Sequence, residues 1–218
     1  MKWKRKSTAQ IGHLRGFYDY PPDSKPDATA DEAFQRLEND FPKARNAIRR
    51  DGYTSWAQHR DVLVSFAAML TARSPLFRGQ SSAEILPALT AHPKGAVLAK
   101  NYAITNMRTE IQRRGSEWRS YHWALNYTST PDEPVITCDH PVSMTSNYAD
   151  QREAYERKDF WLLFPVAWDM CLIGSTVPVD GEQTRQFEPE HRRELVAYIR
   201  KQASLFIVSP VQLTLPLH

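Results

Sequence analysis

The residues best suited to chemistry lie together in one short stretch, Cys138-Asp139-His140-Pro141. The β-branched residues 135–137 before it favour an extended, half-buried backbone. Pro141 lacks an N–H and biases the residue before it away from helix, so the strand should end there in a turn. A carboxylate and an imidazole at a strand end are suited to proton transfer. Asp139 and His140 are therefore the first candidates for a functional site.

A cation for such a site is Arg73, which ends a strongly apolar helical pattern over residues 55–73. The helix dipole favours a cation at this end, which alone accounts for an arginine. On so apolar a face, however, the side chain must either extend its head to water or meet a carboxylate. Both alternatives stay open, and the second predicts that Arg73 lies within ion-pair reach of Asp139.

A second cationic segment, His13-Leu14-Arg15-Gly16-Phe17, lies near the start of the chain. His13 and Arg15 would suit a segment laid over a cleft, because an imidazole transfers protons and a guanidinium binds anionic oxygen. In the alternative interpretation the apolar residues of the segment hold a loop in place while the two cations face water.

Hydrophobic periodicity divides the chain into a helical first half and a strand-rich second half. Steps of three and four residues predict helices over 29–51, 55–73 and 96–114, with a shorter one between 76 and 95. Pro42 predicts a kink or break in the first helix, and Gly115 should end the third long one.

After Gly115 the period becomes two, which predicts a strand over 118–127 that pairs antiparallel with residues 135–138. Continuous apolar runs predict two further strands, buried on both faces, over 160–166 and 170–174. A helix over 189–204 and a final edge strand over 205–210 should follow.

The expected fold class is α+β. A mainly helical N-terminal half packs on a small antiparallel sheet, and a C-terminal helix and edge strand close the fold. Residues 1–218 should form one domain. Its expected parts are an irregular N-terminal segment (1–28), a helical part (29–115), and the sheet with the closing helix (116–218).

Composition limits the classes of partner. With 41% hydrophobic and 24% charged residues the chain is close to the average soluble globular protein. A net charge of +3 leaves an anionic small molecule or a nucleic acid open as partner, and the oligomeric state stays undetermined. No stretch approaches the roughly 20 apolar residues of a membrane span, so no membrane partner is expected. The basic start lacks the apolar region of a signal peptide, so a complete product of this sequence should be cytoplasmic.

Cofactor and metal motifs are missing from the sequence. It contains no glycine-rich phosphate loop, dinucleotide fingerprint, His-Glu-x-x-His or Gly-x-Ser-x-Gly. Nucleotide-cofactor enzymes and zinc hydrolases are therefore disfavoured, and any cofactor is unknown. Cys138 and Cys171, the two cysteines, lie in apolar runs and should be buried, unreactive thiols.

Several short motifs follow one another along nearly the whole chain. They are Leu14-Arg15-Gly16-Phe17, Arg73-Ser74-Pro75, Cys138-Asp139-His140-Pro141, Phe164-Pro165 and the segment from Ala203 to Ser209. In this order they resemble a bacterial family known as domain of unknown function 4238. The family's opening His-Tyr-Val-Pro is absent, with Ser7-Thr8-Ala9-Gln10 roughly in its place, and Cys138 replaces the usual serine. The resemblance supports the fold and the candidate positions but implies no activity.

Two functions from different classes fit these residues, and the sequence does not decide whether the protein is an enzyme. The first is an enzyme that cleaves a phosphodiester or nucleotide, with a toxin or defence role as one setting. Its site would combine Asp139, His140 or His13, Arg73 and Arg15. The second is a noncatalytic interaction or regulatory protein in which Asp139 and Arg73 form a structural ion pair. A catalytic set must converge on an open cleft, whereas a structural pair would be sealed.

Overall fold

The computed structural model describes residues 28–132, 134–138, 140–145, 160–178, 183–203 and 207–209. The helices are α1 (Ala28–Asp51), α2 (Trp56–Ala72), α3 (Pro75–Ile85), α4 (Gly95–Arg119) and α6 (Pro189–Gln202), with the 3-10 turns η2 (Tyr53–Ser55) and η3 (Leu86–Leu89). The strands are β1 (His122–Tyr127), β2 (Thr137–Cys138), β3 (Ser143–Thr145), β4 (Trp161–Ala167), β5 (Met170–Ser175), β6 (Thr184–Gln186) and β7 (Ile207–Val208). The fold is α+β, as the sequence predicts.

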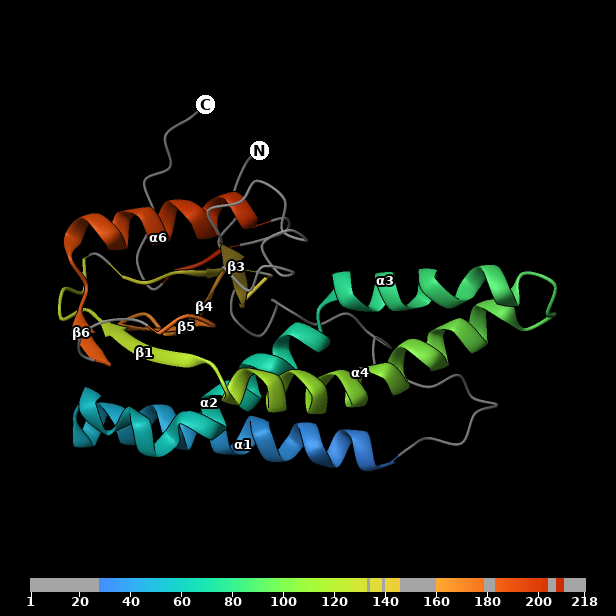
Figure 1. The fold of residues 1–218 in the computed structure, drawn as a ribbon, viewed down its shortest axis with the longest axis horizontal. Coiled ribbons are helices and arrows are strands. Elements are labelled where there is room, and N and C mark those ends of the chain that lie inside the picture. The colour runs from blue at the N-terminus through green and yellow to red at the C-terminus, as the bar shows by residue number, and fades with distance from the viewer. Residues whose placement is uncertain are drawn as a thin grey trace.

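The elements form layers around the main sheet. Helices α1 and α2 and the end of α4 cover one face of it, and α6 covers the other (Figure 1). The hairpin of α3 and α4 extends beyond the sheet (Figure 1). No helix among the described residues is long and apolar enough to cross a membrane.

Helix α1 extends to Asp51, as the periodicity predicts, and Pro42 does not break it, because Ala44 and Ile48, beyond the proline, are buried in the core. One predicted helix limit is wrong. Helix α4 continues through Gly115 to Arg119, because Trp118 on its last turn belongs to the same core. Residues 118 and 119 are therefore helical, and β1 begins only at His122.

The stop predicted at Ser74-Pro75 is confirmed, and the same two residues start the next helix. The Ser74 Oγ accepts a hydrogen bond from the N–H of Phe77 at 3.1 Å, which caps α3. Pro75 occupies the first helical turn, where its missing N–H costs nothing. Arg73 thus lies at a sharp corner between α2 and α3.

The main sheet is mixed rather than antiparallel. Its strand order is β3-β4-β5-β1-β6, and β6 runs parallel to β1 while the other pairs are antiparallel. The predicted strands at β4 and β5 are confirmed, and they are joined by the two-residue turn Trp168-Asp169. Both strands are largely buried, as their continuous apolar runs indicate.

The predicted pairing of residues 135–138 with β1 is wrong. Strand β2 pairs instead with β7 in a separate two-stranded sheet, Thr137 opposite Val208 and Cys138 opposite Ile207. The side chains of Val135, Ile136 and Cys138 are buried in the cluster that includes Leu195 and Ile199 of α6. Packing under α6 therefore selects a different partner strand from the one that sequence order suggests.

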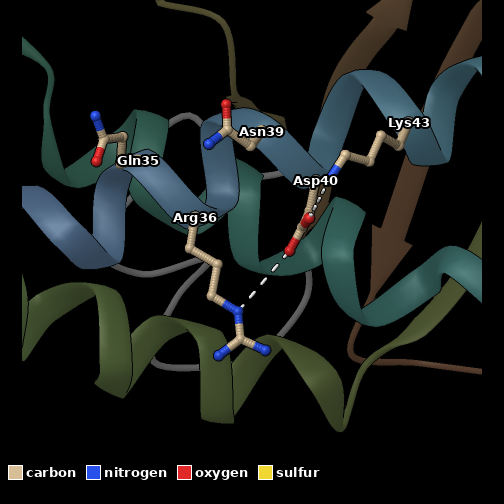
Figure 2. A pocket seen from close by; sticks show the side chains of 5 residues that line it. All are labelled: Gln35, Arg36, Asn39, Asp40 and Lys43. Atoms are coloured by element: carbon tan, nitrogen blue, oxygen red, sulfur yellow. Dashed lines mark hydrogen bonds and ion pairs between the residues drawn. The ribbon is translucent and has the colours of Figure 1, made fainter.

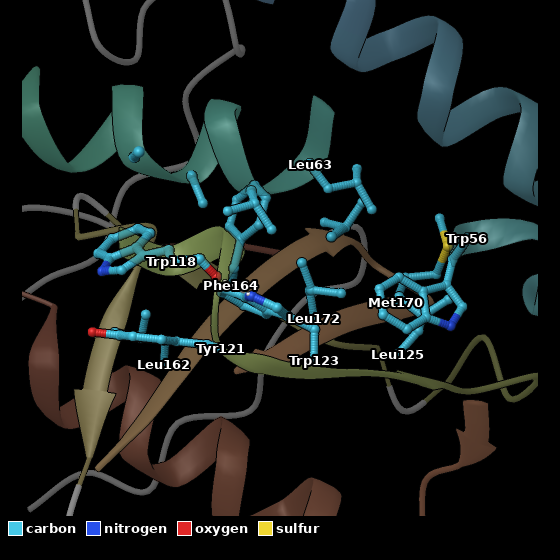
Figure 3. Close-up of a cluster of buried hydrophobic side chains, with 14 of the residues drawn as sticks. Trp56, Leu63, Trp118, Tyr121, Trp123, Leu125, Leu162, Phe164, Met170 and Leu172 are labelled. Atoms are coloured by element: carbon cyan, nitrogen blue, oxygen red, sulfur yellow. Dashed lines mark hydrogen bonds between the residues drawn. The ribbon is translucent and has the colours of Figure 1, made fainter. Parts of the chain in front are cut away.

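The core consists of two main clusters on opposite faces of the main sheet. Figure 3 shows the larger one, in which side chains of α2, α4, β1, β4 and β5 interlock. Its largest members are the aromatic residues Trp56, Trp118, Tyr121, Trp123, Phe160 and Phe164. The smaller cluster lies on the α6 face and contains Cys138 and Cys171. Both thiols are free and buried, as the sequence predicts.

We predict that Gly174→Ala destabilises the fold. Gly174 on β5 lies opposite Trp123 on β1, and a Cβ there would lie 2.6 Å from the indole ring. The overpacking should lower the free energy of unfolding by about 1–3 kcal/mol in a denaturant titration. The matched control is Gly79→Ala in α3, where a Cβ meets nothing within 4 Å and stability should rise by about 0.5–1 kcal/mol. Equal effects of the two substitutions would contradict this packing.

Candidate functional site

Of the two candidates Asp139 and His140, the structure describes His140, which lies in the turn between β2 and β3. Asp139 lies outside the described residues, whereas His140 is half-buried. The His140 carbonyl oxygen accepts hydrogen bonds from the Cys138 thiol (S···O 3.3 Å) and the Ser143 hydroxyl (3.4 Å). The main chain at His140 is thus held from both sides of the turn, which limits the positions open to its imidazole.

This turn carries the chain around the edge of the main sheet. Cys138 lies in the cluster under α6, whereas Val142 and Met144 pack against the cluster on the opposite face. The Tyr198 hydroxyl on α6 donates a hydrogen bond to the Met144 carbonyl oxygen, and burial raises the pKa of Tyr198. His140 therefore lies where the two layers meet, next to the edge strand β3.

Arg73 has a carboxylate partner, and the partner described is Glu38 of α1. The Arg73 guanidinium bonds the Glu38 carboxylate and lies 5.0 Å from the centre of the Phe34 ring. The Arg73 side chain is 20% exposed, and the Glu38 side chain is 46% exposed. The prediction of a carboxylate partner is thus met by Glu38, while the predicted pair with Asp139 falls on a residue outside the described ones.

The remaining candidates, His13 and Arg15, also lie outside the described residues. His140 and Arg73 are the two candidates whose surroundings the structure shows. Their chemistry suits two separate tasks, because a half-buried imidazole can exchange protons and a partly exposed guanidinium can hold an anionic oxygen. Within the described residues no group of three His, Cys, Asp or Glu side chains could hold a metal ion.

A surface depression on α1 is lined by none of these candidates. Figure 2 shows its lining, which consists of Gln35, Arg36, Asn39, Asp40 and Lys43. Asp40 forms ion pairs with Arg36 at 3.8 Å and with Lys43 at 3.2 Å, and both cations are largely exposed. Exposed pairs of this kind contribute little and offer no activated group.

Sequence reasoning missed the most buried ion pair that the structure describes, between Arg49 on α1 and Asp169. The Arg49 Nε donates to the Asp169 carboxylate at 2.9 Å, and a second guanidinium nitrogen bonds its other oxygen. The Tyr53 hydroxyl donates to the same carboxylate at 3.2 Å. The Asp169 side chain is 5% exposed. Three donors therefore satisfy a buried carboxylate, which favours a structural role over proton transfer.

Several neighbouring groups complete this end of the sheet. The Tyr53 ring stacks on Tyr127 with ring centres 4.1 Å apart. Burial, together with the charge and hydrogen bond of Asp169, raises the pKa of Tyr53. The Thr128 N–H donates to the Asp169 carbonyl oxygen, and the Thr128 hydroxyl accepts from buried Arg192 of α6 at 3.0 Å. These contacts join α1, the end of β1, the turn between β4 and β5, and α6. In the sequence, the one signal for this ion pair is the position of Asp169 in a short turn between two apolar strands.

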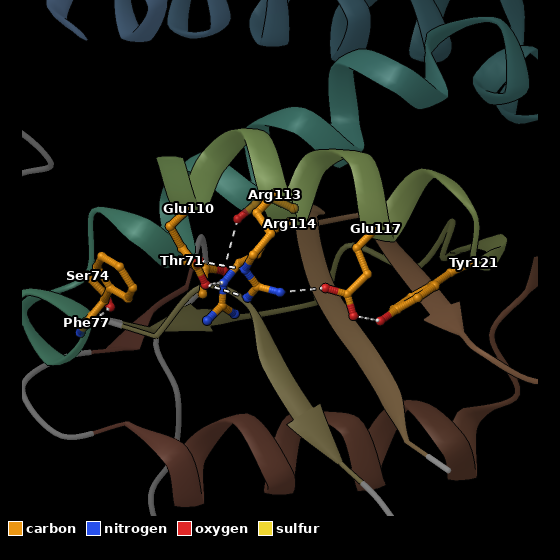
Figure 4. Close-up of polar contacts among 9 residues, drawn as sticks. Thr71, Ser74, Phe77, Glu110, Arg113, Arg114, Glu117 and Tyr121 are labelled. Atoms are coloured by element: carbon orange, nitrogen blue, oxygen red, sulfur yellow. Dashed lines mark hydrogen bonds and ion pairs between the residues drawn. The ribbon is translucent and has the colours of Figure 1, made fainter. Parts of the chain in front are cut away.

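A second polar network follows α4. Figure 4 shows Glu110 bonded by Arg113 and Arg114, and Glu117 bonded by Arg113 and by the Tyr121 hydroxyl. Burial acts to raise the pKa of Glu110, but the hydrogen bonds and charges of the two arginines outweigh it and lower that pKa. The charges of both arginines are thus matched by carboxylates of the same helix.

We predict that Asp169→Asn is destabilising because it leaves the Arg49 guanidinium without its charge partner in a part-buried site. The loss should be about 2–3 kcal/mol of unfolding free energy, measured by denaturant titration near neutral pH. The matched control is Asp40→Asn, whose ion pairs are exposed and whose loss should cost less than about 1 kcal/mol. A cost for Asp169→Asn as small as that of the control would show that the pair does not hold the sheet end.

We predict a pH-dependent contribution from Glu110. Its pKa in the folded chain lies below the reference value of 4.5, so its stabilisation is present above that value and is lost as the pH falls through the folded pKa. The stability difference between the parent and Glu110→Gln should shrink from about pH 6 to about pH 3. Glu84→Gln on exposed α3 serves as control. A difference that is constant over this range would contradict the assignment.

The comparisons with known proteins place the chain in a family without a known activity. The family described as "Protein of unknown function (DUF4238)" matches residues 2–210. No curated protein and no solved structure matches the chain. Since the match spans almost the whole sequence, the chain belongs to this family of proteins of unknown function.

Proposed function

We propose that the protein is an enzyme that acts on an anionic substrate at the turn between β2 and β3. The observation that carries the proposal is the half-buried imidazole of His140, whose main chain is held by the Cys138 thiol and the Ser143 hydroxyl. A proton-transfer group must be both accessible and fixed in position. The main chain of His140 is held in place, and its half-buried side chain keeps some contact with solvent.

The reaction class proposed is hydrolytic cleavage of a phosphodiester or nucleotide. Asp139 or His140 takes the proton from the attacking water or hydroxyl, and the group that then carries a proton returns it to the leaving oxygen. Arg73 supplies a cation for the charge that develops on the phosphate oxygens. His13 and Arg15 are the reserve candidates for the same two roles.

One observation favours the second candidate function, a noncatalytic interaction protein. Arg73 bonds Glu38 and stacks over Phe34, so it ties the corner after α2 to the first half of α1. In the enzyme, the same contact holds the guanidinium in place for a substrate. In the interaction protein, it is only a brace between two helices. The two functions therefore differ in what happens when the acid–base residues are changed.

We predict that Asp139→Asn and His140→Gln each abolish turnover with little change in melting temperature. Both replacements keep the approximate shape but remove the proton-transfer group. Because the substrate class is broad, the parent is first screened for cleavage of RNA, DNA and nucleotides, with and without divalent metal ions. Growth arrest on expression in bacteria is scored in parallel, which also tests the toxin or defence setting in the bacterial cytoplasm.

The matched controls are Asp61→Asn on α2 and His122→Gln at the start of β1, both exposed side chains. They should retain the parent's activity and its growth effect. A parent that is inert in every assay, together with an Asp139→Asn variant that melts far below the Asp61→Asn control, would replace the enzyme by the interaction protein.

A further inference from the structure

The far end of the α3–α4 hairpin carries most of the large apolar side chains that are exposed in the described part of the chain. This end points away from the sheet and the other helices (Figure 1). Its members are Leu86 (42% exposed), Val97 (37%), Leu98 (37%) and Tyr102 (36%), and a fifth such residue elsewhere is Val177 (53%). We call residues 86–102 the hairpin tip. Clustered exposed apolar side chains indicate an interaction site more often than scattered ones do.

The hairpin tip is held in shape by its own backbone. The His92 N–H donates to the Leu89 carbonyl oxygen at 3.0 Å, and the Gly95 N–H donates to the His92 carbonyl oxygen at 2.9 Å. Gly95 packs so closely that a Cβ there would lie 2.3 Å from the Leu89 oxygen. The tip therefore presents its apolar side chains from a fixed scaffold.

The charge of the hairpin tip is net positive. Residues 85–109 contain Lys94, Lys100 and Arg108 and no aspartate or glutamate, and the nearest carboxylate along α3 is Glu84, two residues before Leu86. A surface with this charge attracts an anionic partner. It disfavours a second copy of the same tip, because the two copies would bring like charges together.

We propose that the hairpin tip is a peripheral contact site for an anionic membrane surface. Val97 and Tyr102 are five residues apart on α4 and so point about 140° apart around the helix axis, while Leu86 comes from η3. A helix of a protein partner would contact the apolar side chains on one face of the tip only. A lipid interface can contact the side chains on several faces. Tyrosine and lysine suit this interface, since their apolar parts enter it while their polar ends stay in water.

This proposal is independent of the site at the β2–β3 turn. It also revises the expectation that a chain without a spanning segment has no membrane partner, because a peripheral contact needs no span. The attraction combines partial burial of the four apolar side chains with the positive charge of the tip, and each cation near an anionic surface strengthens binding roughly five-fold.

The test is flotation of the full-length protein with vesicles at low salt. Vesicles of phosphatidylcholine with about one third phosphatidylglycerol should bind the protein, whereas pure phosphatidylcholine should bind it much more weakly, since the leaflet charge supplies part of the attraction. Lys94→Gln with Lys100→Gln should lower the partition coefficient at least roughly five-fold. Leu98→Ser with Tyr102→Ser should lower it at least roughly ten-fold.

The chain offers a matched control for each pair. Val177→Ser removes the exposed apolar side chain outside the tip, and Lys201→Gln removes an exposed lysine on α6. Both should leave vesicle binding unchanged, and circular dichroism should show every variant folded. Absence of binding to the anionic vesicles, or an equal loss in the Val177→Ser control, would overturn the proposal and leave an acidic protein surface as the partner to seek.

Discussion

Burial of the β4–β5 hairpin on both faces is the constraint on which the rest of the fold depends. Phe164 and Leu172 lie in the cluster beneath α1 and α2, whereas Leu163 and Cys171, their neighbours along the same strands, lie in the cluster beneath α6. Alternate residues of a strand face opposite sides, so two apolar faces require two covering layers. Each fully buried large side chain of this hairpin contributes about 1.5–3 kcal/mol, and Phe164, Met170 and Leu172 are all of this kind.

The same two layers explain where the candidate site lies. β2 belongs to the α6 layer and β3 to the edge of the main sheet, so the chain between them must pass around that edge. A segment in such a position is neither buried in a core nor free in water, which leaves His140 half-buried. Its carbonyl oxygen bonds to Cys138 before the turn and to Ser143 after it. The layered fold thus places a half-buried imidazole on a main chain that is held on both sides, and this makes the turn a better candidate than the depression on α1.

The ion pairs of Asp169 and Arg73 differ in how far they are removed from water. Asp169 receives three hydrogen bonds from Arg49 and Tyr53. A carboxylate with this many donors holds the hairpin turn against α1 and is poorly placed to exchange a proton with a substrate. Arg73 represents an intermediate case, since it has a carboxylate partner yet keeps part of its surface in water. Partial contact with water is thus the feature that separates Arg73 and His140 from the Asp169 carboxylate.

The sequence by itself determined the α+β class, the helical first half, both central strands, the closing helix and the burial of both cysteines. These features follow from local periodicity and apolar runs, which act within a few turns or one strand. Tertiary structure alone decided which strands pair, because the partner of residues 135–138 is chosen by packing beneath α6 and not by proximity in sequence. It also extended α4 past Gly115 and left α1 unbroken at Pro42, since burial of Trp118 and Ile48 outweighs the local cost of each helix breaker. The partner of Arg73 was likewise open in the sequence: a helix pattern places a cation at a helix end, but only the packing of α1 beside α2 brings Glu38 to it.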